Sequence, residues 1–248
     1  MAPRLRVGTS GYNFPEWRGS FYPAKLSSKK WLEYYAQQLG TVEINYTFYR
    51  MPSATTVAGW DAATPTSFTF VLKAPQRITH LARLRNIDEP LRLFLELARK
   101  LNVKLGAVLF QLPPNLKKDI DRLGDLLTQF PTDVRAACEF RHASWWSDDV
   151  YALLRSTNTA LCIADTDAGT TPLVATADFG YVRLRDEGYS EERLQDWMTK
   201  VQALGGGSAW TDAFVFFKHE EKGMGPTLAR EFLQLAPDTP HLPTPGSG

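Results

Sequence analysis

Short runs of β-branched and aromatic residues recur along the whole chain, and stretches with a helical hydrophobic period separate most of them. The runs with strand character are Arg4–Thr9, Thr41–Asn45, Phe68–Lys73, Gly106–Gln111, Arg135–Arg141, Ala160–Asp165, Tyr181–Arg185 and Ala213–Lys218. Helical spacing between them is clearest at Ile120, Leu123, Leu127 and Phe130, and at Leu194, Trp197, Met198 and Val201. Eight alternating units favour a closed TIM-type (β/α)8 barrel over an open α/β sheet.

One crossover of this barrel is weak. Between the sixth and seventh strands, residues Thr166–Asp178 contain Gly169, Pro172 and several threonines but little helical period. We expect a loop or a single turn there, so that one (β/α) unit is degenerate. The length of 248 residues suits one barrel. The sequence therefore predicts a single domain over residues 1–236, followed by a Pro/Gly-rich extended tail over 237–248.

Within each predicted strand, side chains two positions apart point to the same face of the sheet. In the second strand, Glu43 and Asn45 therefore lie opposite Val42 and Ile44. The same division in the next three strands gives a polar face that carries Lys73, Gln111, Glu139 and Arg141. We expect the bulky apolar face to contact the helices and the polar face to point into the barrel.

Polar side chains thus converge near the C-terminal ends of the strands, where barrel enzymes keep their chemistry. The candidates are Glu43, Asn45, Lys73, Gln111, Glu139, Arg141, Asp165, Arg183 and Lys218. A charge inside a barrel must be paired, hydrogen-bonded or given to a ligand. Each of them has two interpretations, a buried ion pair that fixes the lumen or a member of a ligand site.

Three of the four histidines, His80, His142 and His219, lie on or just beyond predicted strand ends, while His241 lies in the tail. An imidazole in such a place can act as an acid or base near neutral pH. His142, which directly follows Glu139-Phe-Arg141, is the strongest of these candidates.

The charge balance excludes some classes of function. The chain has 28 Lys and Arg against 27 Asp and Glu, a net charge of +1, so neither a nucleic-acid coat protein nor a polybasic membrane binder is expected. No apolar run has the length of a membrane span or of a signal-peptide core. Cys138 and Cys162 lack CxxC spacing, which is typical of reduced, buried thiols and predicts a cytoplasmic protein.

Several ordered motifs carry a resemblance to a known family. They are Gly8-Thr-Ser-Gly-Tyr12, Thr41-Val-Glu-Ile-Asn-Tyr-Thr-Phe-Tyr49, Phe110-Gln-Leu-Pro-Pro114, Glu139-Phe-Arg-His-Ala-Ser-Trp145, Ile163-Ala-Asp-Thr166 and Tyr181-Val-Arg183. From about Arg4 to Leu235 the chain resembles the domain of unknown function 72 family, also called YecE-like proteins. The resemblance implies a TIM-type barrel and assigns no role to any residue, because the family has no established activity.

The chain departs from the family pattern at two loops. Arg183-Leu-Arg-Asp186 stands where members commonly show Arg-His-Gly, and Lys218-His-Glu220 stands where many carry Asn-Asn. The roles of Arg185, Asp186, Lys218 and His219 therefore cannot be carried over from the family.

Our first hypothesis is an enzyme, hydrolase-like or isomerase-like, that acts on a small anionic or phosphorylated substrate at the C-terminal barrel mouth. Glu43, Glu139 and His142 are its catalytic candidates. The substrate-binding candidates are Asn45, Tyr49, Lys73, Gln111, Arg141, Trp145, Asp165, Arg183 and Lys218. Among them, arginine matches phosphate oxygens with two parallel donors. For the aromatic candidates Tyr49 and Trp145, we favour core packing over a contact with the substrate.

Two alternatives stay open. A divalent metal could be held by ligands from Glu43, Glu139, Asp165, His142 and His219, but lysine and arginine in the same mouth oppose a cation, so we expect no cofactor. A non-catalytic binding or scaffold barrel is the other alternative. It would recognise a nucleotide, nucleic acid or protein partner, for example through the basic run Lys73–Arg85.

Overall fold

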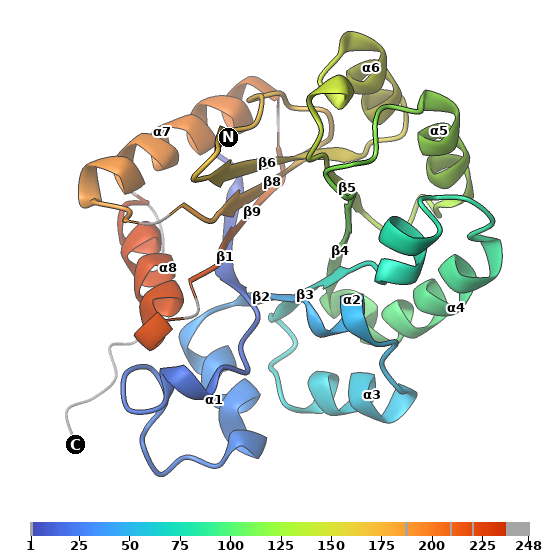
Figure 1. Ribbon diagram of the computed structural model, residues 1–248. Coiled ribbons are helices and arrows are strands. Elements are labelled where there is room, and N and C mark those ends of the chain that lie inside the picture. The colour runs from blue at the N-terminus through green and yellow to red at the C-terminus, as the bar shows by residue number, and fades with distance from the viewer. Residues whose placement is uncertain (1, 187, 209, 220, 237–248) are drawn as a thin grey trace.

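Eight parallel strands close into a barrel, and helices surround it (Figure 1). The computed structural model describes residues 2–186, 188–208, 210–219 and 221–236. The barrel strands are β1 (Arg4–Ser10), β2 (Thr41–Ile44), β3 (Thr69–Lys73), β4 (Leu105–Gln111), β5 (Ala136–Glu139), β6 (Ala160–Thr166), β8 (Phe179–Leu184) and β9 (Asp212–Phe217). They follow the order β5-β4-β3-β2-β1-β9-β8-β6, and pairing of β5 with β6 closes the ring. The predicted TIM-type fold is confirmed; the predicted tail over 237–248 lies outside the described residues.

The α-helices follow the strands along the chain, and all except the short α2 form the outer layer (Figure 1). They are α1 (Trp31–Gln38), α2 (Tyr46–Tyr49), α3 (Ala54–Ala62), α4 (Asp88–Ala98), α5 (Ile120–Gln129), α6 (Asp148–Ser156), α7 (Glu191–Ser208) and α8 (Met224–Gln234). Short helical turns are η1 (Pro15–Trp17), η2 (Ser28–Lys30), the π-turn η3 (Arg77–Leu81), η4 (Arg99–Lys104), η5 (Ala143–Trp145) and η6 (Glu221–Gly223). In the described part of the chain, no helix combines the length and the apolar character needed to cross a membrane.

Helix α5 shows how the sequence forms these outer elements. Its apolar residues Leu123, Leu126 and Leu127 recur at helical spacing and are buried against the barrel. At its N-terminus the Asp119 side chain accepts a hydrogen bond from the backbone N–H of Arg122, which satisfies a donor that the helix itself leaves free.

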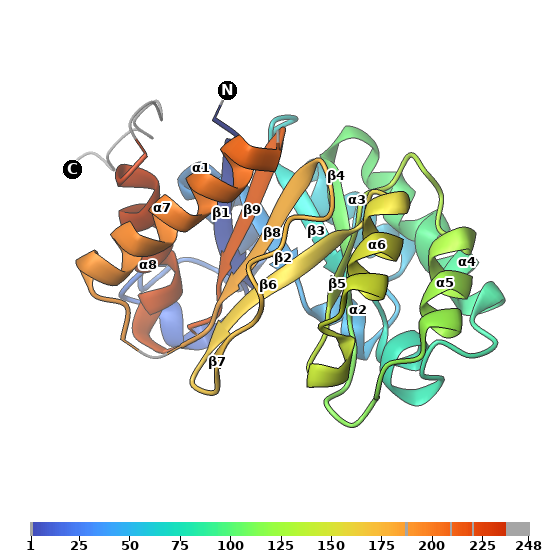
Figure 2. The ribbon, with the colours of Figure 1, turned by 90° about the horizontal axis from the view of Figure 1, so that it is seen from above.

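The crossover from β6 to β8 contains no α-helix over residues 167–178, all of which the structure describes. Instead, β7 (Gly169–Thr170) folds back antiparallel to β6 and projects at the end of that strand (Figure 2). The Thr176 hydroxyl accepts from the N–H of Leu161 and the Thr171 hydroxyl from that of Ala164. Threonine side chains thus occupy part of the edge of β6, and the predicted degenerate crossover is confirmed.

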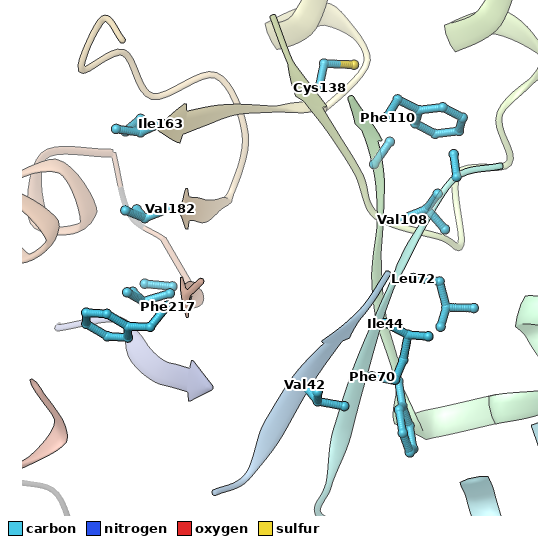
Figure 3. Packing of buried hydrophobic residues seen from close by; sticks show 14 of the residues in the cluster. Val42, Ile44, Phe70, Leu72, Val108, Phe110, Cys138, Ile163, Val182 and Phe217 are labelled. Carbon is cyan, nitrogen blue, oxygen red and sulfur yellow. The ribbon is translucent and has the colours of Figure 1, made fainter. Parts of the chain in front are cut away.

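Two apolar layers hold the barrel together. Outward-pointing side chains such as Val42, Phe70 and Phe110 pack under the helices (Figure 3). The lumen is filled by a separate cluster of Val71, Ala107, Leu109, Ala137, Ala160, Cys162, Phe179, Tyr181, Phe214 and Phe216. This division confirms the two-residue alternation expected for the second to fifth strands.

The two cysteines lie in different layers. Cys138 is buried in the outer layer and Cys162 in the lumen, and both are free thiols. The expectation that both cysteines are buried, free thiols is therefore confirmed.

Candidate functional site

Arg183 is the centre of an ion-pair network in the upper lumen. It lies on β8 and points inward, where its guanidinium contacts Glu43 Oε1 at 2.9 Å and Glu139 Oε2 at close hydrogen-bonding distance. The Tyr181 hydroxyl donates to Glu43 Oε2 at 2.6 Å. Each of these four residues is at most 1% exposed, so the predicted convergence of distant strands on one hollow is confirmed.

Four further side chains extend the network toward the mouth. Lys73 Nζ donates to Gln111 Oε1 at 2.8 Å, and Gln111 Nε2 donates to Glu139 Oε1 at 2.8 Å. Arg141 Nε also donates to Glu139 Oε1, at 3.0 Å. Asn45 Nδ2 donates to the other carboxylate, Glu43, at 3.2 Å. The two glutamates therefore orient a ring of donors that come from different strands.

Above this network lies a pocket of about 750 Å³. Its lining combines cationic and amide side chains with several aromatic rings. The lining side chains from the sequence candidates are Asn45, Tyr49, Lys73, Gln111, Arg141, Arg183 and Lys218. Further lining residues include Tyr12, Phe14, Tyr46, Phe48, Trp60, Gln76, His80 and Arg185. Among the residues that the structure describes, none of the lining side chains is acidic.

Glu43 and Glu139 lie behind Arg183 rather than on the pocket wall. Burial is the largest single effect and would raise the pKa of each carboxyl, but Arg183 and Tyr181 together outweigh it at Glu43, and Arg183, Arg141 and Gln111 together outweigh it at Glu139. The net effect is a lowered pKa for both groups. Two carboxylates held in the ionised form are weak bases near neutral pH. Their geometry is that of groups that anchor cations.

Lys73 has the opposite character. Burial, and secondarily the charge of Arg183, lowers its pKa to about 7. Its ammonium nitrogen lies 4.0 Å from the ring centre of Phe48. The His80 ring packs edge-on against the same ring, with 4.8 Å between the two ring centres. Burial, and secondarily the charge of Lys73, lowers the pKa of His80. Lys73 and His80, which both contact Phe48, are therefore our candidates among the described lining residues for proton exchange.

The structure places Asp165 away from the pocket, contrary to our expectation. Cys162 faces the lumen, so Asp165, three positions further along β6, faces the helices. Its carboxylate accepts from the Tyr189 hydroxyl at 2.7 Å and from the Trp197 indole at 3.1 Å, and pairs with Arg193 at 3.2 Å. Asp165 thus fastens α7 to the outside of the barrel.

Trp145 and His142 also lie outside the lining. Trp145 is buried, stacks on Phe140 and donates its indole N–H to the carbonyl of Leu116 at 2.8 Å. The His142 ring accepts from the backbone N–H of Ser144 and so caps η5. The expected contacts of these two residues with a ligand in the pocket are not supported, because both side chains are committed to loop packing.

The alternative metal ligands do not gather. Asp165 lies on the outer face, His142 caps a loop turn, and the His219 ring lies 2.6 Å from the Asp186 carbonyl oxygen. Among the described residues, no three side chains of His, Cys, Asp or Glu come together in a way that would hold a metal ion. The two carboxylates at the centre, Glu43 and Glu139, are bound to Arg183. The predicted metal ligands therefore do not fit a divalent cation.

Part of the pocket lining lies outside the residues predicted from the sequence. Arg185 reaches the pocket, and its guanidinium lies 3.8 Å from Glu139. The alternation that joins Tyr181 with Arg183 would also have included it. Ser10 ends β1 and the residues Gly11 to Phe14 follow it, while Tyr46 and Phe48 lie on α2, directly after β2; segments that follow barrel strands lie at the mouth.

A family model described as "Protein of unknown function DUF72" matches residues 6–246. The chain is 27% identical to the UPF0759 protein YunF of Bacillus subtilis, over 93% of this chain and 94% of that protein. It is 31% identical to the UPF0759 protein YecE of Escherichia coli K12 over a shorter stretch, 58% of this chain and 50% of that protein.

Solved structures of similar proteins share the fold. A DUF72 family protein from Thermotoga maritima superposes with a TM-score of 0.78 at 26% identity, covering 94% of this chain and 98% of that one. A DUF72 family protein from Enterococcus faecalis superposes with a TM-score of 0.79 at 19% identity, covering 98% and 100% of the two chains.

Proposed function

The chain belongs to the DUF72 family, whose function is not known, and from that premise we propose that its barrel mouth is the active site of an enzyme for a small anionic substrate. The substrate carries a phosphate or a carboxylate, and the reaction is hydrolase-like or isomerase-like. A pocket of about 750 Å³ is in the usual range for small-molecule sites.

The observation that carries this proposal is an excess of positive charge. Glu43 and Glu139 would be neutralised by two cations, yet Arg141, Arg183 and Arg185 all contact them. Lys73 adds an amine to the same pocket lining. Burial and Arg183 lower the pKa of Arg185, which is the effect expected of like charges crowded in a dry place. An anionic ligand would relieve this repulsion.

The exposure of the arginines supports a binding role. The Arg183 side chain is 2% exposed, whereas those of Arg141 and Arg185 are 33% and 21% exposed. Arg183 therefore fixes the floor, while the other two retain donors that can reach a ligand. A guanidinium presents paired N–H donors that suit phosphate and carboxylate oxygens.

The aromatic part of the lining favours a substrate with an apolar or ring-shaped part. It consists of Tyr12, Phe14, Phe48 and Trp60 together with the exposed ring of Tyr49. Aromatic surface in the same pocket as a cluster of cations suits a molecule with an anionic end and a flat or hydrophobic body.

Proton transfer falls to Lys73 and His80 rather than to the glutamates. A general acid or base works best when its pKa is near the working pH, and burial brings that of Lys73 to about 7. We assign to Glu43 and Glu139 the positioning of Arg183, Gln111 and the cations around them.

Calorimetric titration of the full chain with inorganic phosphate and pyrophosphate tests the proposal. We expect binding that weakens at least about 10-fold, or 1.4 kcal/mol, in Arg141→Met. The matched control is Arg92→Met on α4, whose exposed guanidinium pairs with Glu96, and it should bind like the parent protein.

Two results would overturn the proposal. One is the absence of any anion binding at millimolar concentration in a folded protein. The other is equal affinity in the Arg141 variant and its control. Steeply salt-dependent binding of an oligonucleotide that Arg141→Met leaves unchanged would instead support the scaffold alternative.

A further inference from the structure

The amine of Lys73 faces the pocket without a carboxylate of its own. Its described hydrogen bond is to the neutral amide oxygen of Gln111, at 2.8 Å. The nearby carboxylates of Glu43 and Glu139 are bound to Arg183 instead. Within the described residues, no ion pair joins Lys73 to an aspartate or glutamate, although its residue is only 8% exposed.

The surroundings of this amine oppose its charged form. Burial removes water from the ammonium, and Arg183 places a like charge nearby; Glu43 and Glu139, although bound to Arg183, partly offset these effects, and Arg141 adds to them. The face of Phe48, 4.0 Å away, favours an ammonium by about 0.5–2 kcal/mol. These attractions together are smaller than the cost of burying an ammonium that has no direct ion pair. The pKa near 7 agrees with this balance and means that a large part of the amine is neutral in a neutral solution.

Lys104 provides an internal comparison. It is also buried, at 7% exposure, but its ammonium pairs with the Asp61 carboxylate at 2.9 Å and donates to the carbonyl of Thr64 at 2.8 Å. Those contacts stabilise the charged form of Lys104, which has a structural role. Lys73 has one amide acceptor and an open side toward the pocket.

We propose that Lys73 is a nucleophile that forms a covalent imine with the carbonyl group of an anionic aldehyde or ketone substrate held by the mouth arginines. This inference rests on the proposed function and narrows its substrate class. Gln111, itself held by Glu139, keeps the amine on the pocket wall, and Arg141 and Arg185 hold the anionic end of the substrate.

The step balances without an oxidant or reductant. The nitrogen lone pair forms a bond to the carbonyl carbon while the carbonyl π electrons move to oxygen, and a proton passes from nitrogen to oxygen to give a carbinolamine. The carbon–oxygen bond then breaks, the oxygen leaves as water after taking one proton from solvent, and a protonated imine remains. That cation withdraws electrons from the neighbouring carbon and makes its C–H bond acidic, which suits isomerase-like chemistry.

Pyridoxal 5′-phosphate is a suitable probe because it joins an aldehyde to a phosphate. The full chain is incubated with it at pH 7, reduced with borohydride and analysed by intact mass and peptide mapping. We expect one equivalent on Lys73, formed at least about 10-fold more slowly when inorganic phosphate saturates the pocket. Lys104 should stay unlabelled. The Lys73→Met variant should not form the adduct that the parent protein forms at Lys73, while its circular dichroism spectrum should be unchanged.

A parallel reaction with pyridoxal, which lacks the phosphate, separates this inference from the proposed function. Labelling of Lys73 by both reagents at the same rate, without competition by phosphate, would support a reactive amine and overturn the anion site. Calorimetric binding of pyridoxal 5′-phosphate with no product on Lys73 would support the anion site and overturn the nucleophile. Neither binding nor labelling would overturn both.

Discussion

Replacing Arg183 by methionine removes the cation that Glu43 and Glu139 share. Methionine keeps much of the volume and the apolar stem but leaves no charge between the two carboxylates. Glu43 retains the hydroxyl of Tyr181, and Glu139 retains Arg141. The loss is therefore close to that of one broken buried ion pair.

The magnitude follows from the burial of these groups. Breaking a buried pair by removing one partner typically costs about 3–5 kcal/mol, and both glutamates are at most 1% exposed. For a chain of this length, each kcal/mol lowers the melting temperature by roughly 2–4 °C. We expect Arg183→Met to melt roughly 6–20 °C below the parent protein at pH 7.

The pH dependence of the loss has a definite sign. In the parent protein the pKa of both glutamates lies below the ordinary value of 4.5 for a glutamate. Their stabilisation is thus present above about pH 4.5 and is lost as the pH falls through the folded pKa. In the variant, burial dominates and raises the pKa of these carboxyls, so acidification neutralises them and relieves the penalty. The stability gap should narrow from pH 8 to pH 5.

Urea unfolding followed by circular dichroism at pH 5, 6, 7 and 8 measures this effect. Arg92→Met, which removes an exposed partner of Glu96, should cost less than about 0.5 kcal/mol. The double variant Arg183→Met with Glu43→Gln should recover part of the loss at pH 8. A loss below about 1 kcal/mol for Arg183→Met, or a gap that does not change with pH, would refute the account of the network.

Three further predictions concern the fold, a correction and the reactive lysine. A Cβ at Gly8 would lie 2.1 Å from the carbonyl oxygen of Thr41, so Gly8→Ala should lower the free energy of unfolding by about 3 kcal/mol or more. Gly124 on α5 has open space around it, so Gly124→Ala should raise the free energy of unfolding by about 0.5–1 kcal/mol. Urea unfolding measures both. Asp165→Asn should cost about 1.5–3 kcal/mol of stability and leave phosphate affinity in calorimetry unchanged; weaker binding would return this residue to the mouth. Because the folded pKa of Lys73 is about 7 and the unfolded value is higher, its penalty is full below pH 7 and disappears by about pH 10.4. Lys73→Met should therefore be more stable than the parent by about 1–3 kcal/mol at pH 6, with the difference vanishing at high pH, and equal stability at pH 6 would contradict a buried, unpaired ammonium.

The parts of the site that the sequence predicted are those ruled by strand periodicity. Glu43, Lys73, Gln111 and Glu139 occupy inward positions because side chains two apart share a face. The prediction for Asp165 rests on its place at a strand end and not on this alternation. Its strand alternates so that Leu161, Ile163 and Asp165 point outward, and the same test would have corrected it.

The remaining differences arise where no period operates. Trp145 and His142 belong to a short turn whose direction depends on packing against Phe140 and on a local cap. Gln76 and His80 lie at or within the π-turn after β3, and a single-turn conformation of that kind leaves no pattern in the sequence. The pKa values of the network likewise depend on distances between strands far apart in the chain, which only the closed barrel brings together.

A crystal structure of the protein grown with phosphate tests the central claim most directly, because that claim is an excess of positive charge aimed into one pocket. We predict a tetrahedral anion at the mouth, within hydrogen-bonding distance of Arg141 or Arg185 and near the amine of Lys73. Density for phosphate only on the outer surface, with water alone in the pocket at a saturating concentration, would contradict it.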